Sequence, residues 1–250
     1  MVRSLPLSLV ISMLGAREDA GVATPPDDAA YGALIGEAAI RGLTLVPPAD
    51  YAGLAIEEGW WGRPPGAADD FVGDGAVGWF QVGVSRDLTP GSISLICECA
   101  YAACRDVGPF AFQGLVLRFL SERVAYDHSF ATYIAERLPA HGEAAMKPVT
   151  ITTEVREGTR DDAVRVLLDS ADELLSLLAD AAGWELRHEV LGSPRVGSGR
   201  AQLCMRVPYW SHTMAAFLCA LVLAADDVGL LTGVRVTLTR SAVGPRRRRG

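Results

Sequence analysis

The chain has 250 residues, of which 50% are apolar and 21% are charged, so it has enough apolar residues for a large core and is not an intrinsically disordered segment. The formal net charge of −7, with one dense basic cluster at Arg246 to Arg249, disfavours a nucleic-acid-binding protein, because phosphate neutralisation requires a basic face. Five cysteines without regular spacing do not form the pattern of a secreted disulfide framework, which indicates a cytoplasmic protein.

Almost all positive charge is carried by arginine, since Lys147 is the only lysine. This bias, together with abundant Ala, Gly, Val and Asp, indicates a bacterial genome of high GC content. Lys147 lies in a connector just before a predicted strand, so we expect neither Schiff-base chemistry nor a phosphate-binding P-loop. The longest uncharged apolar stretch, residues 213–225, is too short to span a bilayer, and no membrane association is predicted.

The first half contains three predicted strands and two predicted helices. Apolar alternation and helical periodicity place them in chain order as strand 5–14, helix 27–42, strand 76–84, helix 92–107 and strand 115–120. Residues 43–75, rich in Pro, Gly and Trp, are predicted to be a long insertion. A connector at residues 121–147 follows, with a short helix near residues 130–138.

The second half gives a clearer pattern. Residues 150–156 alternate between apolar and polar side chains, and residues 161–182 carry a leucine stripe at helical spacing. Two strands, 185–191 and 201–207, are predicted on either side of a Gly/Ser/Pro-rich turn, and Ser211 is positioned to cap the next, largely apolar helix. A strand at 234–239 completes the unit.

The sequence Asp-Val-Gly occurs at the end of a predicted helix in both halves, at Asp106 and at Asp227, and a Gly-led strand follows each time. The element order strand, helix, strand, strand, helix, strand is typical of ferredoxin-like folds. We therefore predict an α+β protein with tandem duplicated ferredoxin-like (βαββαβ) units forming a pseudo-dimeric α/β sandwich. The predicted divisions are residues 1–120, 121–147, 148–241 and an Arg-rich tail at 242–250.

The predicted insertion is the first candidate for a functional element. It holds the tryptophan pair Trp60 and Trp61 together with Arg63, Asp69 and Asp70. Paired indoles beside an arginine are suited to a ligand-stacking platform or an interface anchor. Equally, the indoles could simply cover the edge of the sheet, which is the common role of loop tryptophans.

A polar strand face in the second half is the second candidate. Strand phasing predicts that one face carries Thr150, Thr152, Glu154, Arg156, Glu185, Arg187, Glu189, Gln202, Cys204, Arg206, Arg235, Thr237 and Thr239. This face lines a pocket if the two sheets pack face to face, and it faces solvent if they do not.

Four polar residues of the second half are candidates for catalysis. They are His212, Tyr209, Arg206 and Glu154, which together offer a general base and charge-stabilising groups. The alternative for His212 is a residue at a helix start beside its cap Ser211. Cys97, Cys99 and Cys104 lack metal-ligand spacing and are predicted to be buried thiols, so we expect no metal and no cofactor.

No motif names a reaction, so two functional hypotheses follow. The first is a cytosolic protein-binding or regulatory module that controls or neutralises a partner protein. The second is a small-molecule enzyme of bacterial specialised metabolism, of the cyclase or isomerase type, with a pocket between the two repeats. Convergence of His212, Tyr209, Arg206 and Glu154 on one enclosed space would favour the enzyme. Both hypotheses are compatible with a monomer or a homodimer.

Overall fold

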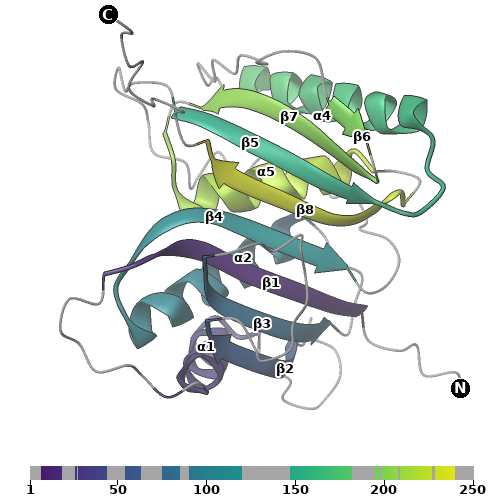
Figure 1. Cartoon of the computed structure of the whole chain (residues 1–250). Coiled ribbons are helices and arrows are strands. Elements are labelled where there is room, and N and C mark those ends of the chain that lie inside the picture. The colour runs from purple at the N-terminus through teal and green to yellow at the C-terminus, as the bar shows by residue number, and fades with distance from the viewer. Residues whose placement is uncertain are drawn as a thin grey trace, which may run out of the picture.

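The structure, a computed structural model, describes residues 7–18, 26, 28–43, 54–62, 75–84, 90–119, 147–181, 195–197, 199–207, 209–226 and 229–239. It is an α+β protein in which the described strands form one eight-stranded sheet, in the order β2-β3-β1-β4-β8-β5-β7-β6. All neighbouring strands pair antiparallel. The described helices lie on one side of this sheet (Figure 1).

The elements of the first half are β1 (Leu7–Arg17), α1 (Ala29–Ile40), β2 (Leu54–Trp61), β3 (Ala76–Val84), α2 (Pro90–Val107) and β4 (Phe110–Phe119). Those of the second half are β5 (Lys147–Val155), α4 (Asp161–Ala181), β6 (Arg195–Gly197), β7 (Arg200–Val207), α5 (His212–Ala224) and β8 (Leu231–Leu238). Each half therefore shows the βαββαβ order of a ferredoxin-like fold.

The two halves join edge to edge rather than face to face. Strand β4 pairs with β8, and Leu115 lies opposite Val236 within this seam. The same pairing extends from Gly114, opposite Thr237, to Arg118, opposite Gly233. Of the two arrangements left open by the sequence, face-to-face packing of two sheets does not occur, because the β4 edge of the first half pairs with the β8 edge of the second.

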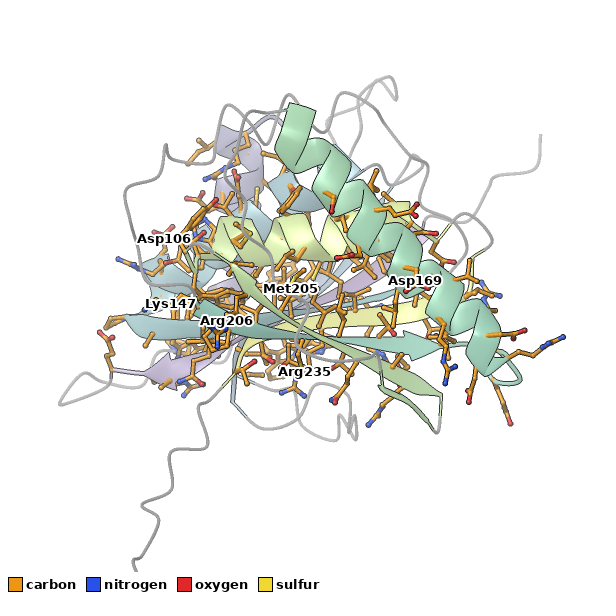
Figure 2. The ribbon with its side chains drawn as sticks, turned by 90° about the horizontal axis from the view of Figure 1, so that it is seen from above. Asp106, Lys147, Asp169, Met205, Arg206 and Arg235 are labelled. Atoms are coloured by element: carbon orange, nitrogen blue, oxygen red, sulfur yellow. The ribbon has the colours of Figure 1, made fainter. Side chains whose placement is uncertain are left out.

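The core fills the space between the helices and one face of the sheet. Alternate strand residues point into it, as in β5, where Val149 and Ile151 are buried while Thr150 and Thr152 are only partly buried on the opposite face. Helix α5 is buried along nearly its whole length, and it packs against α2, α4 and the strands β4 and β8. Figure 2 shows Met205 on the helix side of the sheet and Arg235 on the other side.

Two elements differ from the sequence prediction. The segment predicted as an irregular insertion contains the edge strand β2, and part of the predicted turn GSPRVGSGR forms the three-residue strand β6. The strand predicted at 185–191 and the connector at 121–147, apart from Lys147, lie outside the described residues. Edge strands tolerate glycine and irregular composition, which is why β2, with Gly59 and a bulge opposite β3, lacked a clear alternating pattern.

The tight seam generates the first testable prediction. A Cβ atom added at Gly114 would lie 2.7 Å from both the Val236 carbonyl oxygen and Thr237 Cγ2, so Gly114→Ala should force β4 and β8 apart and lower the free energy of unfolding by about 1–3 kcal/mol. The matched control is Gly36→Ala at an exposed position of α1, where an added Cβ atom would have no atom within 4 Å. This control should raise stability by about 0.5–1 kcal/mol, as urea denaturation would measure. Equal effects of the two substitutions would contradict the tight seam.

Candidate functional site

The helix-free side of β5, β7 and β8 presents a polar surface, which we call the polar face. It is made of alternate residues of three adjacent strands, as the phasing predicts: Thr150, Thr152, Glu154, Gln202, Cys204, Arg206, Arg235 and Thr237. Hydrogen bonds link some of these side chains, since Thr150 Oγ1 lies 2.8 Å from Thr239 Oγ1 and Gln202 Nε2 donates to Thr152 Oγ1 at 3.5 Å.

An ion-pair cluster lies where the polar face meets the first half of the chain. Glu154 Oε2 is 3.2 Å from Arg118 Nη2, and Glu154 Oε1 is 3.8 Å from Arg200 Nη2. Arg118 belongs to β4 and Glu154 to β5, with Gly233 of β8 between them in the register. Because Gly233 has no side chain, the two charged groups meet over the intervening strand.

Arg235 adds a third guanidinium to this part of the face. It lies two residues beyond Gly233 on β8, opposite both Thr152 of β5 and Val116 of β4. Burial lowers the pKa of Arg235 below its ordinary value, and the positive charge of Arg200 lowers that pKa further. Arg118 and Arg200 thus contact the Glu154 carboxylate, and Arg235 lies close enough to Arg200 to feel its charge.

His212 and Tyr209 lie on the helix side of the sheet, where Tyr209 packs against the core and His212 belongs to an aromatic cluster with Tyr101 and Phe112. The imidazole of His212 stacks on the Tyr101 ring with 3.7 Å between ring centres and an interplanar angle of 4°. Phe112 lies edge-on to both rings and stacks against Trp210. Ser211 caps α5 by accepting a hydrogen bond from the Met214 amide, which confirms the predicted cap.

The cluster keeps His212 neutral. Burial lowers the pKa of His212, and the nearby Arg105 lowers it further, while Glu98 acts in the opposite direction. Burial also raises the pKa of the Tyr209 phenol. Desolvation therefore favours the uncharged forms of both groups.

The four candidate catalytic residues do not converge. Glu154 and Arg206 belong to the polar face, whereas Tyr209 and His212 pack against the core on the helix side. The sheet lies between the two pairs, because Glu154 of β5 and Arg206 of β7 point to the helix-free side, whereas Tyr209 and His212 lie on the helix side. The structure consequently offers no shared enclosed space for these four groups.

The side chains of Trp60 and Trp61 point to opposite sides of the sheet, because the two residues are successive in the edge strand β2. Trp60 lies opposite Trp79 on the helix-free side, whereas Trp61 joins the core and is only 6% exposed. Arg17 covers Trp61, with its guanidinium 5.0 Å from the ring centre and a hydrogen bond of 3.3 Å to the Trp61 carbonyl. The other predicted insertion residues, Arg63, Asp69 and Asp70, lie outside the described residues.

The cysteines of α2 are buried in the core, at 2% exposure or less for Cys97, Cys99 and Cys104. Burial raises the pKa of Cys99 to about 11, so this thiol is protonated at neutral pH. Among the residues described by the structure, no group of three or more His, Cys, Asp or Glu side chains is arranged to hold a metal ion. None of the described helices combines the length and apolar character needed to cross a membrane.

Sequence reasoning found the polar face but missed the ion-pair cluster. Arg200 and Arg235 carry a usable signal, because each shares the strand phase of the polar residues beside it. Arg118 belongs to the other half, and only the β4–β8 register brings it to Glu154.

Comparison with known proteins assigns no family. No family model matches the sequence, and no curated protein matches it. Among solved structures, the chain is similar to chlorite dismutase from Candidatus Nitrospira defluvii in complex with imidazole, with 12% identity over 92% of each chain and a TM-score of 0.26. A mutant of that enzyme gives 10% identity over 95% of this chain and 92% of the other, with a TM-score of 0.27. A Cas6 product complex gives 13% identity over 92% of this chain and 100% of the other, with a TM-score of 0.21. Similarities of this size carry no functional argument.

The ion pair over Gly233 should contribute measurably to stability. In a double-mutant cycle with Arg118→Met and Glu154→Gln, we expect a coupling energy of about 0.5–1 kcal/mol that shrinks in high salt. The same cycle on the exposed pair Arg160 and Asp162 of α4, with side chains 82% and 65% exposed, serves as a control and should give a smaller coupling. A coupling no larger than that of the control would show that the pair does not tie the halves together.

The environment of His212 predicts a pH dependence. The native state holds the imidazole neutral, whereas the unfolded chain protonates it with an ordinary pKa of 6.5, so the unfolded state takes up more protons as the pH falls. The free energy of unfolding should be highest above about pH 7 and should decrease as the pH falls through 6.5. His212→Gln should flatten this decline, which urea unfolding at several pH values would show. An unchanged slope in the variant would assign the decline to other groups.

Proposed function

We propose that this chain is a protein-binding or regulatory module that controls or neutralises a partner protein, and that the partner docks on the polar face. The observation that carries the proposal is the polar, partly exposed helix-free side of the second half of the sheet. The described helices cover only one side, while β5, β7 and β8 present exposed or partly exposed polar side chains on the other side. A flat polar surface of this kind is suited to a protein partner rather than to enclosing a small molecule.

The enzyme hypothesis, a cyclase or isomerase type, lacks comparable support. It depends on polar groups gathered in a space between two sheets, and the halves join in one sheet. His212, its best candidate base, is stacked on Tyr101 with its Nε2 atom 3.3 Å from Thr213 Oγ1.

We also infer that the two halves arose by internal duplication. Asp106 and Asp227 are 121 positions apart (227 − 106), and Leu115 and Val236, which face each other in the seam, are also 121 apart (236 − 115). If each residue of the first half is equated with the residue 121 positions later, Leu115 and Val236 are equivalent to each other. The paired residues Gly114 and Thr237 are then equivalent to the paired residues Arg235 and Val116. Such a register is what a pseudo-two-fold axis between β4 and β8 requires.

Duplication offers a reason for a specialised second half. On the helix-free side of the first half, Ser12 and Val116 are 0% and 1% exposed, whereas the equivalent side of the second half carries exposed polar groups. One copy then serves as the structural support while the other is available for recognition.

The test is native mass spectrometry of the tagged protein, purified gently from a bacterial host with a GC-rich genome. Gln202→Trp would place a bulky ring at an exposed position of the polar face, and we expect it to abolish a complex of fixed stoichiometry that the unaltered protein forms. Val166→Trp is the control, because Val166 is 65% exposed on α4, on the other side of the sheet. Retention of the partner by Gln202→Trp would overturn the docking face. A small-molecule adduct without any protein partner would instead support the enzyme hypothesis.

A further inference from the structure

Helix α1 has an apolar outer surface, which we call the α1 face. Among the described residues, three of the four large apolar side chains that are exposed belong to this helix, and Ile40 is 79% exposed. The other exposed positions of the helix hold glycine or alanine, so no charged side chain interrupts the surface. The α1 face consists of Tyr31, Gly32, Ile35, Gly36, Ala39 and Ile40.

The place of α1 in the fold does not require this composition. Helix α4 is the first helix of the second half, as α1 is of the first half, and it exposes charged residues such as Arg165 and Asp169. On its inner side α1 buries Ala30, Leu34 and Ala38, and the helix packs on α2 and β2. A helix that is apolar on all sides is ordinarily buried on all sides. The α1 face is therefore an apolar surface that no described element covers.

Gly32 and Gly36 form a groove in the α1 face. A Cβ atom added at either position would have no atom within 4 Å outside the helix itself, so packing within the chain requires neither glycine. Neither residue has the positive φ that favours glycine. Because glycine destabilises a helix interior relative to alanine, the pair is a disadvantage for the isolated molecule. Two such glycines do allow the backbone of another helix to approach closely.

The α1 face also has a ridge that matches its groove. Residues four apart lie in one row on a helix surface. One row is the ridge of Tyr31, Ile35 and Ala39, and the adjacent row contains the groove at Gly32 and Gly36. Rows of this kind interdigitate when two helices cross at about −50°. About a two-fold axis, the ridge of one copy enters the groove of the other, and the reverse contact follows by symmetry.

Electrostatics favour a second copy at this surface. The chain has a net charge of −7, so two copies repel each other, whereas the α1 face brings no charge into the contact. A two-fold axis also runs the two helices in nearly opposite directions. The positive N-terminal end of each helix dipole then lies nearer to the negative C-terminal end of the other.

We propose that the α1 face is the interface of a homodimer, in which α1 of two copies of this chain packs about a two-fold axis. This inference goes beyond the proposed function, because α1 lies beside the edge strand β2, at the opposite end of the sheet from β5, β7 and β8 (Figure 1). The polar face of each copy stays free for a partner. A contact made by one helix of 12 residues belongs to the small interfaces, below about 1,200 Å², so we expect a dimer that dissociates on dilution.

The test is sedimentation velocity of the full chain from about 1 to 500 µM, which measures the dissociation constant of the dimer. Ile35→Glu places two like charges near the two-fold axis, and we expect it to raise this constant by at least about tenfold. Glutamate is a good helix former and position 35 is exposed, so the variant should fold, as circular dichroism would check. Val166→Glu on α4 is the matched control and should change the constant by less than about twofold.

Gly36→Leu is a second variant that keeps the fold. Leucine favours a helix more than glycine does, and its side chain has open space in the single chain, but it fills the groove and should also weaken the dimer at least about tenfold. The higher stability expected for Gly36→Ala refers to the dissociated chain and is measured in the dilute range.

A mixture of Ile35→Glu and Ile35→Arg distinguishes a second copy from any other occupant. Each variant alone should be monomeric, and an equimolar mixture should form a heterodimer, because opposite charges then face each other near the axis. Two variants that stay monomeric when mixed would overturn the two-fold packing of α1.

Two further outcomes would overturn the proposal: an unaltered chain that stays monomeric over the whole range, and a dimer that Ile35→Glu leaves intact. Loss of a co-purified protein from a monomeric Ile35→Glu variant would reassign the α1 face to that protein. Gln202→Trp, on the other side of the sheet, should leave the dimer unchanged, so the docking face and the dimer interface are tested separately.

Discussion

The hydrogen-bonded pairing of β4 with β8 is the constraint on which the rest of the molecule depends. It uses the last strand of each half, so that two βαββαβ units become one eight-stranded sheet. Once the strand edges are joined in this way, the two sheets cannot also face each other. Both sets of helices then lie on the same side, and α2 packs directly against α5.

Joining the sheet edges also brings together side chains that belong to different halves. Arg118 comes within 3.2 Å of Glu154 only because β8 lies between their strands and contributes Gly233 at that position. On the helix side the same joining places Tyr101 against His212. The seam thus carries a charged cluster on one side of the sheet and a neutral aromatic cluster on the other.

The sequence allowed most helices and strands to be located, because their periodicities are local. The strand alternation of residues 150–156 and 201–207 assigned the polar face correctly, and Ser211 marked the start of α5. What it could not indicate was which strand edges meet, because alternation defines faces and leaves the pairing partner undetermined. The Trp60–Trp61 pair was misread as a loop for a related reason: its strand is an edge strand with a bulge and a glycine, which obscures the alternation.

The position of β8 near the end of the described chain has a consequence for biosynthesis. The first half emerges from the ribosome long before Leu231–Leu238 is synthesised. The β4 edge therefore lacks its β8 partner while more than a hundred further residues are added. During that interval, residues 110–119 present unpaired backbone groups flanked by Leu115, Val116 and Leu117. A second nascent chain could pair with the same edge, so the order of synthesis makes exchange of halves between neighbouring molecules the characteristic misfolding hazard of this architecture.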